Sequence, residues 1–96
     1  MKFHLSKKAK SDLIKIARYT QLNWGRQQRN DYLKLLDSVF QQIAEEPELG
    51  YACDDIRQGD KKRPQGSHVI YYKEFGKKEV IIIRVLYKSM DVHRAF

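Results

Sequence analysis

Histidine and basic side chains are the groups of this sequence that could act chemically, and the reaction they suggest is cleavage of a phosphodiester. The chain has three histidines, His4, His68 and His93. A ribonuclease that uses the 2′-hydroxyl needs a base for that hydroxyl, an acid for the leaving oxygen and cations for the phosphate. Cations are plentiful, because Lys and Arg number 19 against 12 Asp and Glu. A convincing acid–base pair is missing, since no tyrosine follows Tyr87.

The sequence lacks the residues that other kinds of reactive site require. The single Cys53 cannot form an internal disulfide and has no CxxC partner, which argues against a redox centre and a zinc site. The sequence also contains no phosphate-binding glycine loop, metal-ligand cluster or nucleophile motif. We therefore expect no metal and no cofactor, and we interpret Cys53 as a small, half-buried loop residue.

Two of the candidate groups have a structural interpretation beside the functional one. The basic run Lys61-Lys62-Arg63 could contact phosphates, but such a run on an edge strand more often keeps that edge solvated. His68 could be a general base, although a histidine hydrogen-bonded to backbone at the start of a strand is commoner. Both interpretations require a sheet that carries these residues.

The element that would organise this sheet is a central strand over residues 80–87, a continuous β-branched and aromatic run. The turn-like segment Phe75-Gly76-Lys77-Lys78 precedes it and predicts a hairpin with a strand over residues 68–73. Alternation predicts one dry face and one face interrupted by a charge. The dry face would carry Ile81, Ile83, Val85 and Tyr87, and the other face Val80, Ile82, Arg84 and Leu86.

Arg84 needs an explanation, because it lies in the middle of this apolar strand. A charge in such a position must be paired or must line a recessed site. The structural alternative to a functional site is an ion pair with Asp54, Asp55 or Asp91.

The first half of the chain predicts a helical hairpin that packs on the sheet. Residues 2–5 indicate a short first strand, and Ser6 offers an N-cap for an amphipathic helix. Gly25 interrupts this helix, and a second amphipathic helix continues to Pro47. The tight glycine connection makes the two helices antiparallel, and the sheet is the flat surface on which their apolar stripes can be buried. The stripes are Ala9, Leu13, Ile16, Ala17, Thr20 and Trp24, then Tyr32, Leu33, Leu36, Val39, Phe40, Ile43 and Ala44.

Between the helices and the hairpin, residues 48–55 are expected to form a loop. Residues 61–63 are expected on an edge strand, because Pro64 cannot donate a hydrogen bond to a neighbour. Residues 90–96 are expected to form a short helix or an extended tail.

Size and charge bound the possibilities further. A chain of 96 residues predicts a single domain over residues 1–96. No segment approaches the roughly 20 apolar residues of a membrane span, and residues 1–5 are too short for the apolar region of a signal peptide, so we expect a cytoplasmic protein that does not contact membranes. The net charge of +7 indicates attraction to polyanions such as nucleic acid or an acidic protein segment.

Several short motifs, taken in order and spacing, resemble a known family across nearly the whole chain. They are Leu5-Ser6-Lys7-Lys8-Ala9 with Asp12-Leu13 and Ile16, Tyr19-Thr20 with Trp24-Gly25, Pro47-Glu48-Leu49-Gly50, Ile56-Arg57 with Gly66-Ser67-His68-Val69-Ile70-Tyr71-Tyr72, and Ile83-Arg84-Val85-Leu86 with Ser89-Met90-Asp91-Val92. Together they resemble the ParE-type toxins of the ParE/RelE superfamily, which belong to type II toxin–antitoxin systems.

The resemblance implies an α+β fold of order β-α-α-β-β-β, with the N-terminal strand and helical hairpin on one face of a small, mainly antiparallel sheet. It also implies a ParD-like antitoxin as partner, whose C-terminal half folds as it wraps the toxin. The target would be DNA gyrase, alone or in complex with DNA, so the protein would be an inhibitor of replication rather than an enzyme. Two alternatives remain open: a RelE-like, ribosome-dependent mRNA endoribonuclease, and a degenerate homologue that only binds its antitoxin.

Site residues follow from this interpretation. For antitoxin binding we expect a hairpin groove that receives an amphipathic helix. For the target we expect contacts from one sheet surface and the tail. In the ribonuclease alternative, His68 or His93 would be the acid or base, and Arg63, Arg84 and Lys88 would stabilise the phosphorane. The groove residues are Leu13, Ile16, Tyr19 and Trp24, and the target-binding residues are Arg63, His68, Arg84, Lys88, Met90 and His93.

Overall fold

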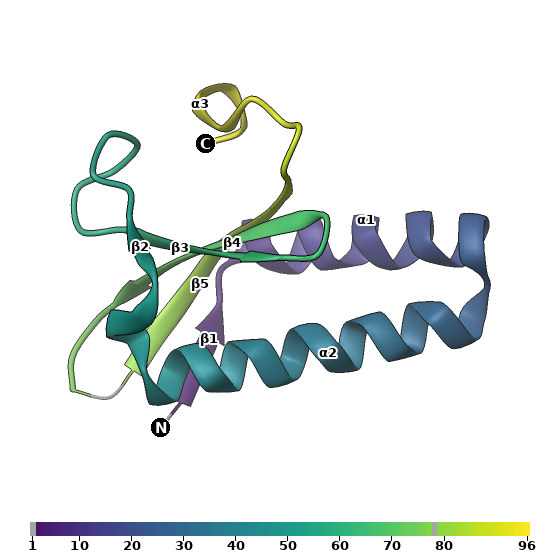
Figure 1. Ribbon diagram of the computed structural model, residues 1–96, viewed down its shortest axis with the longest axis horizontal. Helices are drawn as coiled ribbons and strands as arrows, with labels where there is room; N and C mark the ends of the chain where they lie inside the picture. Colours follow the sequence, from purple (N-terminus) through teal and green to yellow (C-terminus); the bar gives the residue numbers. More distant parts are fainter. Residues whose placement is uncertain (1, 78) are drawn as a thin grey trace.

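Two long helices cover one face of a five-stranded sheet, and a short helix near the C-terminus lies over the other face (Figure 1). The computed structural model describes residues 2–77 and 79–96. The predicted turn at 75–78 includes Lys78, which lies outside the described residues. The strands are β1 (Lys2–Leu5), β2 (Tyr51–Ala52), β3 (Lys61–Gln65), β4 (His68–Glu74) and β5 (Glu79–Tyr87).

The strands are ordered β1-β5-β4-β3-β2 in the sheet. Only the β1–β5 pair is parallel among the described strands, and every other neighbouring pair is antiparallel. The first strand of the chain is thus hydrogen-bonded to the last one. This arrangement confirms the predicted α+β fold with a mainly antiparallel sheet.

The helical hairpin is formed by α1 (Lys7–Trp24) and α2 (Arg26–Glu45). Ser6 caps α1, since its hydroxyl accepts a hydrogen bond from the Ala9 amide at 2.9 Å. Gly25 joins the helices with a φ of +93°, which a residue with a Cβ rarely adopts. The hairpin extends beyond the sheet at this turn (Figure 1). Within residues 2–77 and 79–96, no helix is long and apolar enough to cross a membrane.

The main core lies between the hairpin and the sheet. Its helical side confirms most of the predicted stripes, because both helices bury residues at the expected spacing. Trp24 is an exception, with 64% of its surface exposed at the end of α1. The buried residues of this core are Ala9, Ile16, Leu36, Val39, Phe40, Ile43, Ala44, Ile70, Tyr72, Val80, Ile82 and Val85.

The buried face of β5 differs from the prediction because the strand contains a bulge. Tyr71 lies opposite Arg84 but Tyr72 lies opposite Ile82, so Ile83 is an extra residue in β5. The bulge places Val85 on the same side as Ile82, in the main core. The predicted dry face was therefore wrong at Ile81 and Ile83, which are only half-buried.

Residues 47–52 are more ordered than the predicted loop. Pro47–Leu49 form a 3₁₀ turn, and Tyr51–Ala52 form β2. The sequence predicted an edge strand over residues 61–63. Because β2 pairs with Lys61 and Lys62, β3 is not at the edge of the sheet at these two residues. Pro64 lies in the part of β3 beyond this pairing, where its missing amide hydrogen is tolerated.

A second, smaller cluster covers the other face of the sheet. The helix α3 (Val92–Ala95), which confirms the short C-terminal helix, packs there against Tyr71 and Leu86. The ring of Phe96 meets that of Tyr71 edge-on, with centroids 5.1 Å apart. Cys53 belongs to this cluster and is buried, with 1% exposure, rather than half-buried as predicted.

Candidate functional site

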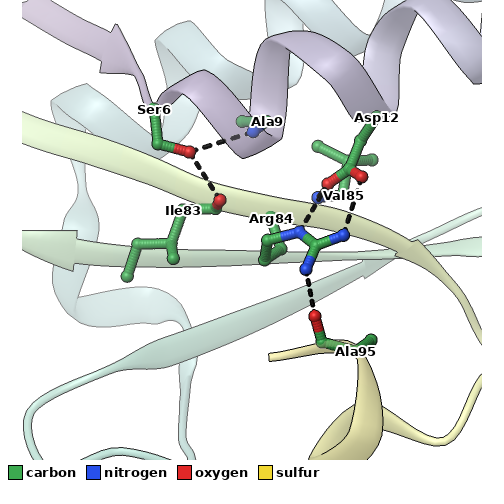
Figure 2. A network of polar contacts seen from close by, with 7 residues as sticks. All are labelled: Ser6, Ala9, Asp12, Ile83, Arg84, Val85 and Ala95. Atoms are coloured by element: carbon green, nitrogen blue, oxygen red, sulfur yellow. Dashed lines mark hydrogen bonds and ion pairs between the residues drawn. The ribbon is translucent and has the colours of Figure 1, made fainter.

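Arg84 forms an ion pair that links the sheet to both α1 and α3 (Figure 2). Its Nε and Nη2 atoms donate to Oδ2 and Oδ1 of Asp12, each at 2.9 Å. Its Nη1 donates to the carbonyl oxygen of Ala95. The hydrogen bond to Asp12 raises the pKa of Arg84 above its ordinary value. The predicted ion pair exists, but Asp54, Asp55 and Asp91 were wrong as partners.

Asp12 reaches Arg84 because α1 continues along β5 where β1 ends. The amide of Ser6 donates to the Ile82 carbonyl at 3.0 Å, and its hydroxyl donates to the Ile83 carbonyl at 2.7 Å. Farther along, the Val85 amide donates to Oδ2 of Asp12 at 3.0 Å. Ser6 and Asp12 therefore satisfy backbone groups of β5 that a longer β1 would otherwise pair (Figure 2).

The position of Asp12 in the sequence indicates that it needs a partner. An acidic residue lies on the buried stripe of α1, between Ala9 and Ile16, and a carboxylate at such a position needs a partner. This observation would have paired Asp12 with the buried arginine of β5.

The linked aromatic rings of Tyr19, Tyr87, His68 and Tyr32 line a pocket of about 370 Å³. This aromatic pocket lies between the end of the hairpin where α1 and α2 are joined and the β3–β4 turn. His68 at its base is 4% exposed, and its ring stacks on that of Tyr87 with centroids 4.4 Å apart. The lining residues are Tyr19, Thr20, Trp24, Gln28, Asp31, Tyr32, Leu35, Gly66, Ser67, His68 and Tyr87.

His68 is held by a side chain of α2 rather than by the backbone bond expected. Its Nδ1 lies 2.6 Å from the hydroxyl of Tyr32, which in turn lies 3.4 Å from the carbonyl oxygen of Gln65. A proton on Nδ1 satisfies this chain best, since Nδ1 donates to Tyr32 and Tyr32 donates to Gln65. In the described part of the protein Nε2 then has a buried lone pair without a partner.

Burial lowers the pKa of His68 below its ordinary value, so the ring is neutral at neutral pH. A base that takes a proton from a substrate must lie within hydrogen-bond reach of it. Nε2 is shielded from solvent, and Nδ1 is already bonded to Tyr32. In this structure His68 packs against Tyr32 and Tyr87, and neither ring nitrogen is open to solvent for proton transfer.

The lowered pKa predicts that acid destabilises the fold through His68. This contribution to stability is complete above the pKa of the unfolded chain, 6.5, and is lost as the pH falls from there toward the lower folded-state pKa. Through this group the free energy of unfolding falls by at most about 1.4 kcal/mol for each pH unit. Denaturant unfolding at about pH 7.5 and about pH 5.5 measures it. His68→Gln should reduce the pH dependence and the exposed-site control His93→Gln should not; equal dependence in both variants would contradict the prediction.

The remaining predicted target-binding residues lie apart from His68. Arg63 donates to Oε1 of Gln42 in α2 at 2.7 Å, whereas Lys88, Met90 and His93 are exposed after β5 and on α3. The expected single sheet surface is thus not formed, because Arg63 and His68 contact α2 while Arg84 contacts α1 and α3. The residues named for ribonuclease chemistry are not brought together for the same reason.

The predicted hairpin groove is also divided. Ile16 is 2% exposed in the main core and lines no surface groove. Tyr19 and Trp24 line the aromatic pocket, whereas Leu13 lines a second pocket of about 340 Å³. This aliphatic pocket lies between the two helices and β1. Its lining residues are Phe3, Leu5, Leu13, Ile14, Ala17, Leu33, Leu36, Asp37 and Phe40.

Among residues 2–77 and 79–96, no group of three or more His, Cys, Asp or Glu side chains is placed to hold a metal ion. Two of the pockets on the described surface lie beside exposed apolar side chains of the hairpin. This arrangement suits recognition of another protein.

Comparisons with known proteins give the family context. The profile of the family described as "ParE toxin of type II toxin-antitoxin system, parDE" matches residues 3–92. Toxin ParE1 of Mycobacterium tuberculosis is 37% identical over 93 residues, which cover 97% of this chain and 95% of that protein. Toxin ParE1 of Caulobacter vibrioides is 38% identical over 89 residues, covering 93% and 91%.

A solved structure supports the fold independently. It is described as the chromosomal ParDE TA system from P. aeruginosa, and one of its chains superposes with a TM-score of 0.75 at 16% identity. The match covers 91% of this chain and 95% of that chain. At this level of identity the likeness shows the fold.

Proposed function

This chain belongs to the family of ParE toxins of type II toxin–antitoxin systems, and on this basis we propose that it inhibits DNA gyrase and is neutralised by a ParD-like antitoxin. The observation that carries the proposal is the family match over residues 3–92. In this proposal residues 1–96 are one toxin domain that acts in the cytoplasm by binding, without catalysis. In this proposal, inhibition of gyrase blocks replication.

The surface of the hairpin supports an antitoxin partner. Large apolar side chains of the hairpin are exposed mainly on α1, and Leu22 is the most exposed of them at 86%. Large apolar side chains that gather on the exposed surface of a domain are candidates for coverage by a partner. The other exposed apolar residues of the hairpin are Ile14, Tyr19, Trp24 and Leu35.

The charge of the protein is compatible with the same partner. Exposed basic residues accompany the apolar side chains along α1, so an acidic antitoxin segment with apolar anchors would complement this surface. Opposite charge mainly increases the rate of encounter, whereas buried apolar anchors supply most of the affinity. The exposed basic residues of α1 are Lys7, Lys8, Lys10, Lys15 and Arg18.

The tail after β5 is the best remaining candidate for the gyrase contact. Lys88, Met90 and His93 are exposed there, whereas His68 and Arg84 are occupied by internal partners. We therefore place the target contact on this tail and treat Arg84 as the residue that anchors it, through the carbonyl of Ala95.

A supercoiling and cleavage assay tests the proposal directly. Purified gyrase, plasmid and ATP are incubated with the free protein, with and without its antitoxin. We expect cleaved or linear plasmid to accumulate, and the antitoxin to prevent it. No effect of folded, antitoxin-free protein on gyrase would overturn the proposed target, and transcript cleavage on translating ribosomes would then be the activity to measure.

A variant of the exposed hairpin separates poisoning from neutralisation. Leu22→Asp should leave gyrase poisoning unchanged but weaken antitoxin binding by about tenfold or more, as expected for loss of an apolar anchor. Leu49→Asp is the matched control, because Leu49 is similarly exposed, at 70%, but lies outside the hairpin. Equal antitoxin affinity of both variants would remove the hairpin from the proposed interface.

A further inference from the structure

The aromatic pocket has walls suited to a cation. Tyr19 and Tyr87 stand nearly perpendicular, at 78°, with ring centroids 5.9 Å apart, and Trp24 and Tyr32 complete the wall. The face of an aromatic ring carries partial negative charge and attracts cations, and several rings around one space form a cage for them.

The charges of the pocket favour the same kind of ligand. None of its lining residues in the described part of the chain is Lys or Arg, although these make up 19 of the 96 residues. Its charged lining residue is Asp31, whose Oδ1 accepts a hydrogen bond from Gln27 at 3.0 Å. Within residues 2–77 and 79–96 its Oδ2 makes no hydrogen bond, and Asp31 is exposed. His68 adds no charge, because burial keeps its ring neutral.

We propose that the aromatic pocket binds the guanidinium group of an arginine side chain from a protein partner, with Asp31 as its counter-ion. The inference rests on the proposed function, in which that partner is the antitoxin. A planar guanidinium can stack on Trp24 or Tyr19 and still donate to a carboxylate, which a lysine ammonium does less well.

The aliphatic pocket makes the occupant more specific. Its walls are mainly Leu, Ile, Ala and Phe side chains, which suit an apolar anchor. A partner with contacts in both pockets would therefore place an apolar residue in the aliphatic pocket and an arginine in the aromatic pocket. This pattern would distinguish its cognate partner from a segment with apolar anchors alone.

Trp24 provides a direct reporter, since it is the single tryptophan of the chain and lines the pocket. The full-length protein is titrated with N-acetyl-arginine N-methylamide while the indole N–H signal of Trp24 is followed by NMR. The citrulline and norleucine analogues are the neutral polar and apolar probes. We expect the arginine probe to bind about tenfold tighter than either, as for a partly desolvated cation on aromatic rings. Equal or tighter binding of a neutral probe, or no shift at Trp24, would overturn the proposal.

Two variants on α2 test the counter-ion. Asp31→Asn should weaken arginine binding about fivefold and leave norleucine binding unchanged. Asp37→Asn is the matched control, because Asp37 is also exposed on α2, also accepts from a glutamine one turn away, Gln41 at 2.9 Å, and lines the other pocket. Equal losses in both variants would show that Asp31 acts only through net charge and would overturn its assignment.

A third variant tests the rings. Tyr19 is 54% exposed, so Tyr19→Leu keeps an apolar wall and should not unfold the protein. Loss of the arginine preference in this variant is expected, and retention of it would contradict a cation–π contribution. Antitoxin binding measured in parallel separates the two proposals, since the antitoxin could bind tightly while the arginine probe fails.

Discussion

Replacing Asp12 with alanine is expected to lower the free energy of unfolding by about 3–5 kcal/mol, the usual cost of removing one partner from a buried ion pair. The substitution leaves the guanidinium of Arg84, whose side chain is 12% exposed, without its counter-ion. It also removes the acceptor of the Val85 amide. Urea denaturation followed by circular dichroism measures the change.

A matched substitution on the surface controls for loss of a carboxylate. Asp37→Ala removes an exposed acid of α2 and should change stability by no more than about 0.5 kcal/mol. If Asp12→Ala cost no more than this control, the ion pair would contribute nothing measurable to folding. In the double variant Asp12→Leu with Arg84→Met, both charges are absent, and the loss should be smaller than the sum of the single losses.

Gly50→Ala is expected to destabilise the protein by about 2–4 kcal/mol, through overpacking and a disturbed hydrogen bond. The cause is steric, because Gly50 has an ordinary φ of −72°, which alanine adopts freely. A Cβ on Gly50 would overlap the hydroxyl of Tyr72 and lie 2.7 Å from its ring carbon Cζ. Tyr72 has little room to move, since it is 1% exposed and donates to the Pro47 carbonyl at 2.7 Å.

Thermal unfolding of two further variants isolates this clash. Tyr72→Phe alone should cost about 1 kcal/mol for the lost hydrogen bond to Pro47. Added to Gly50→Ala, it should recover part of the loss, because the overlapping hydroxyl is gone. Strictly additive losses in the double variant would show that the two residues do not compete for the same space.

The elements of the fold were predictable wherever one physical signal dominated. The Ser6 cap, the break at Gly25 and the end of the second helix before Pro47 each depend on a local backbone rule, and all are found. The face of β5 was not predictable from a period of two, because the bulge at Ile83 depends on the pairing with β4. The short strand β2 was missed for a similar reason, since two residues carry no periodic pattern.

The candidate site was harder to predict, because its partners come from distant parts of the chain. The sequence indicated that Arg84 needs a partner, but not that α1 would lie along β5 and present Asp12. His68 and Trp24 were assigned to different surfaces, yet both line the aromatic pocket. That pocket exists only once the end of the hairpin is packed near the β3–β4 turn, which no local pattern specifies.

The parallel pairing of β1 with β5 has a consequence for biosynthesis. Lys2 pairs with Glu79 and Leu5 with Ile82. The strand β1 therefore cannot pair until β5 has been synthesised. The β1–β5 and β4–β5 pairings and the Asp12–Arg84 contact cannot form while β5 is still unsynthesised. The main core is thus completed late, because Val80, Ile82 and Val85 of β5 belong to it, and until β5 is made the hairpin lacks the central strand that it covers.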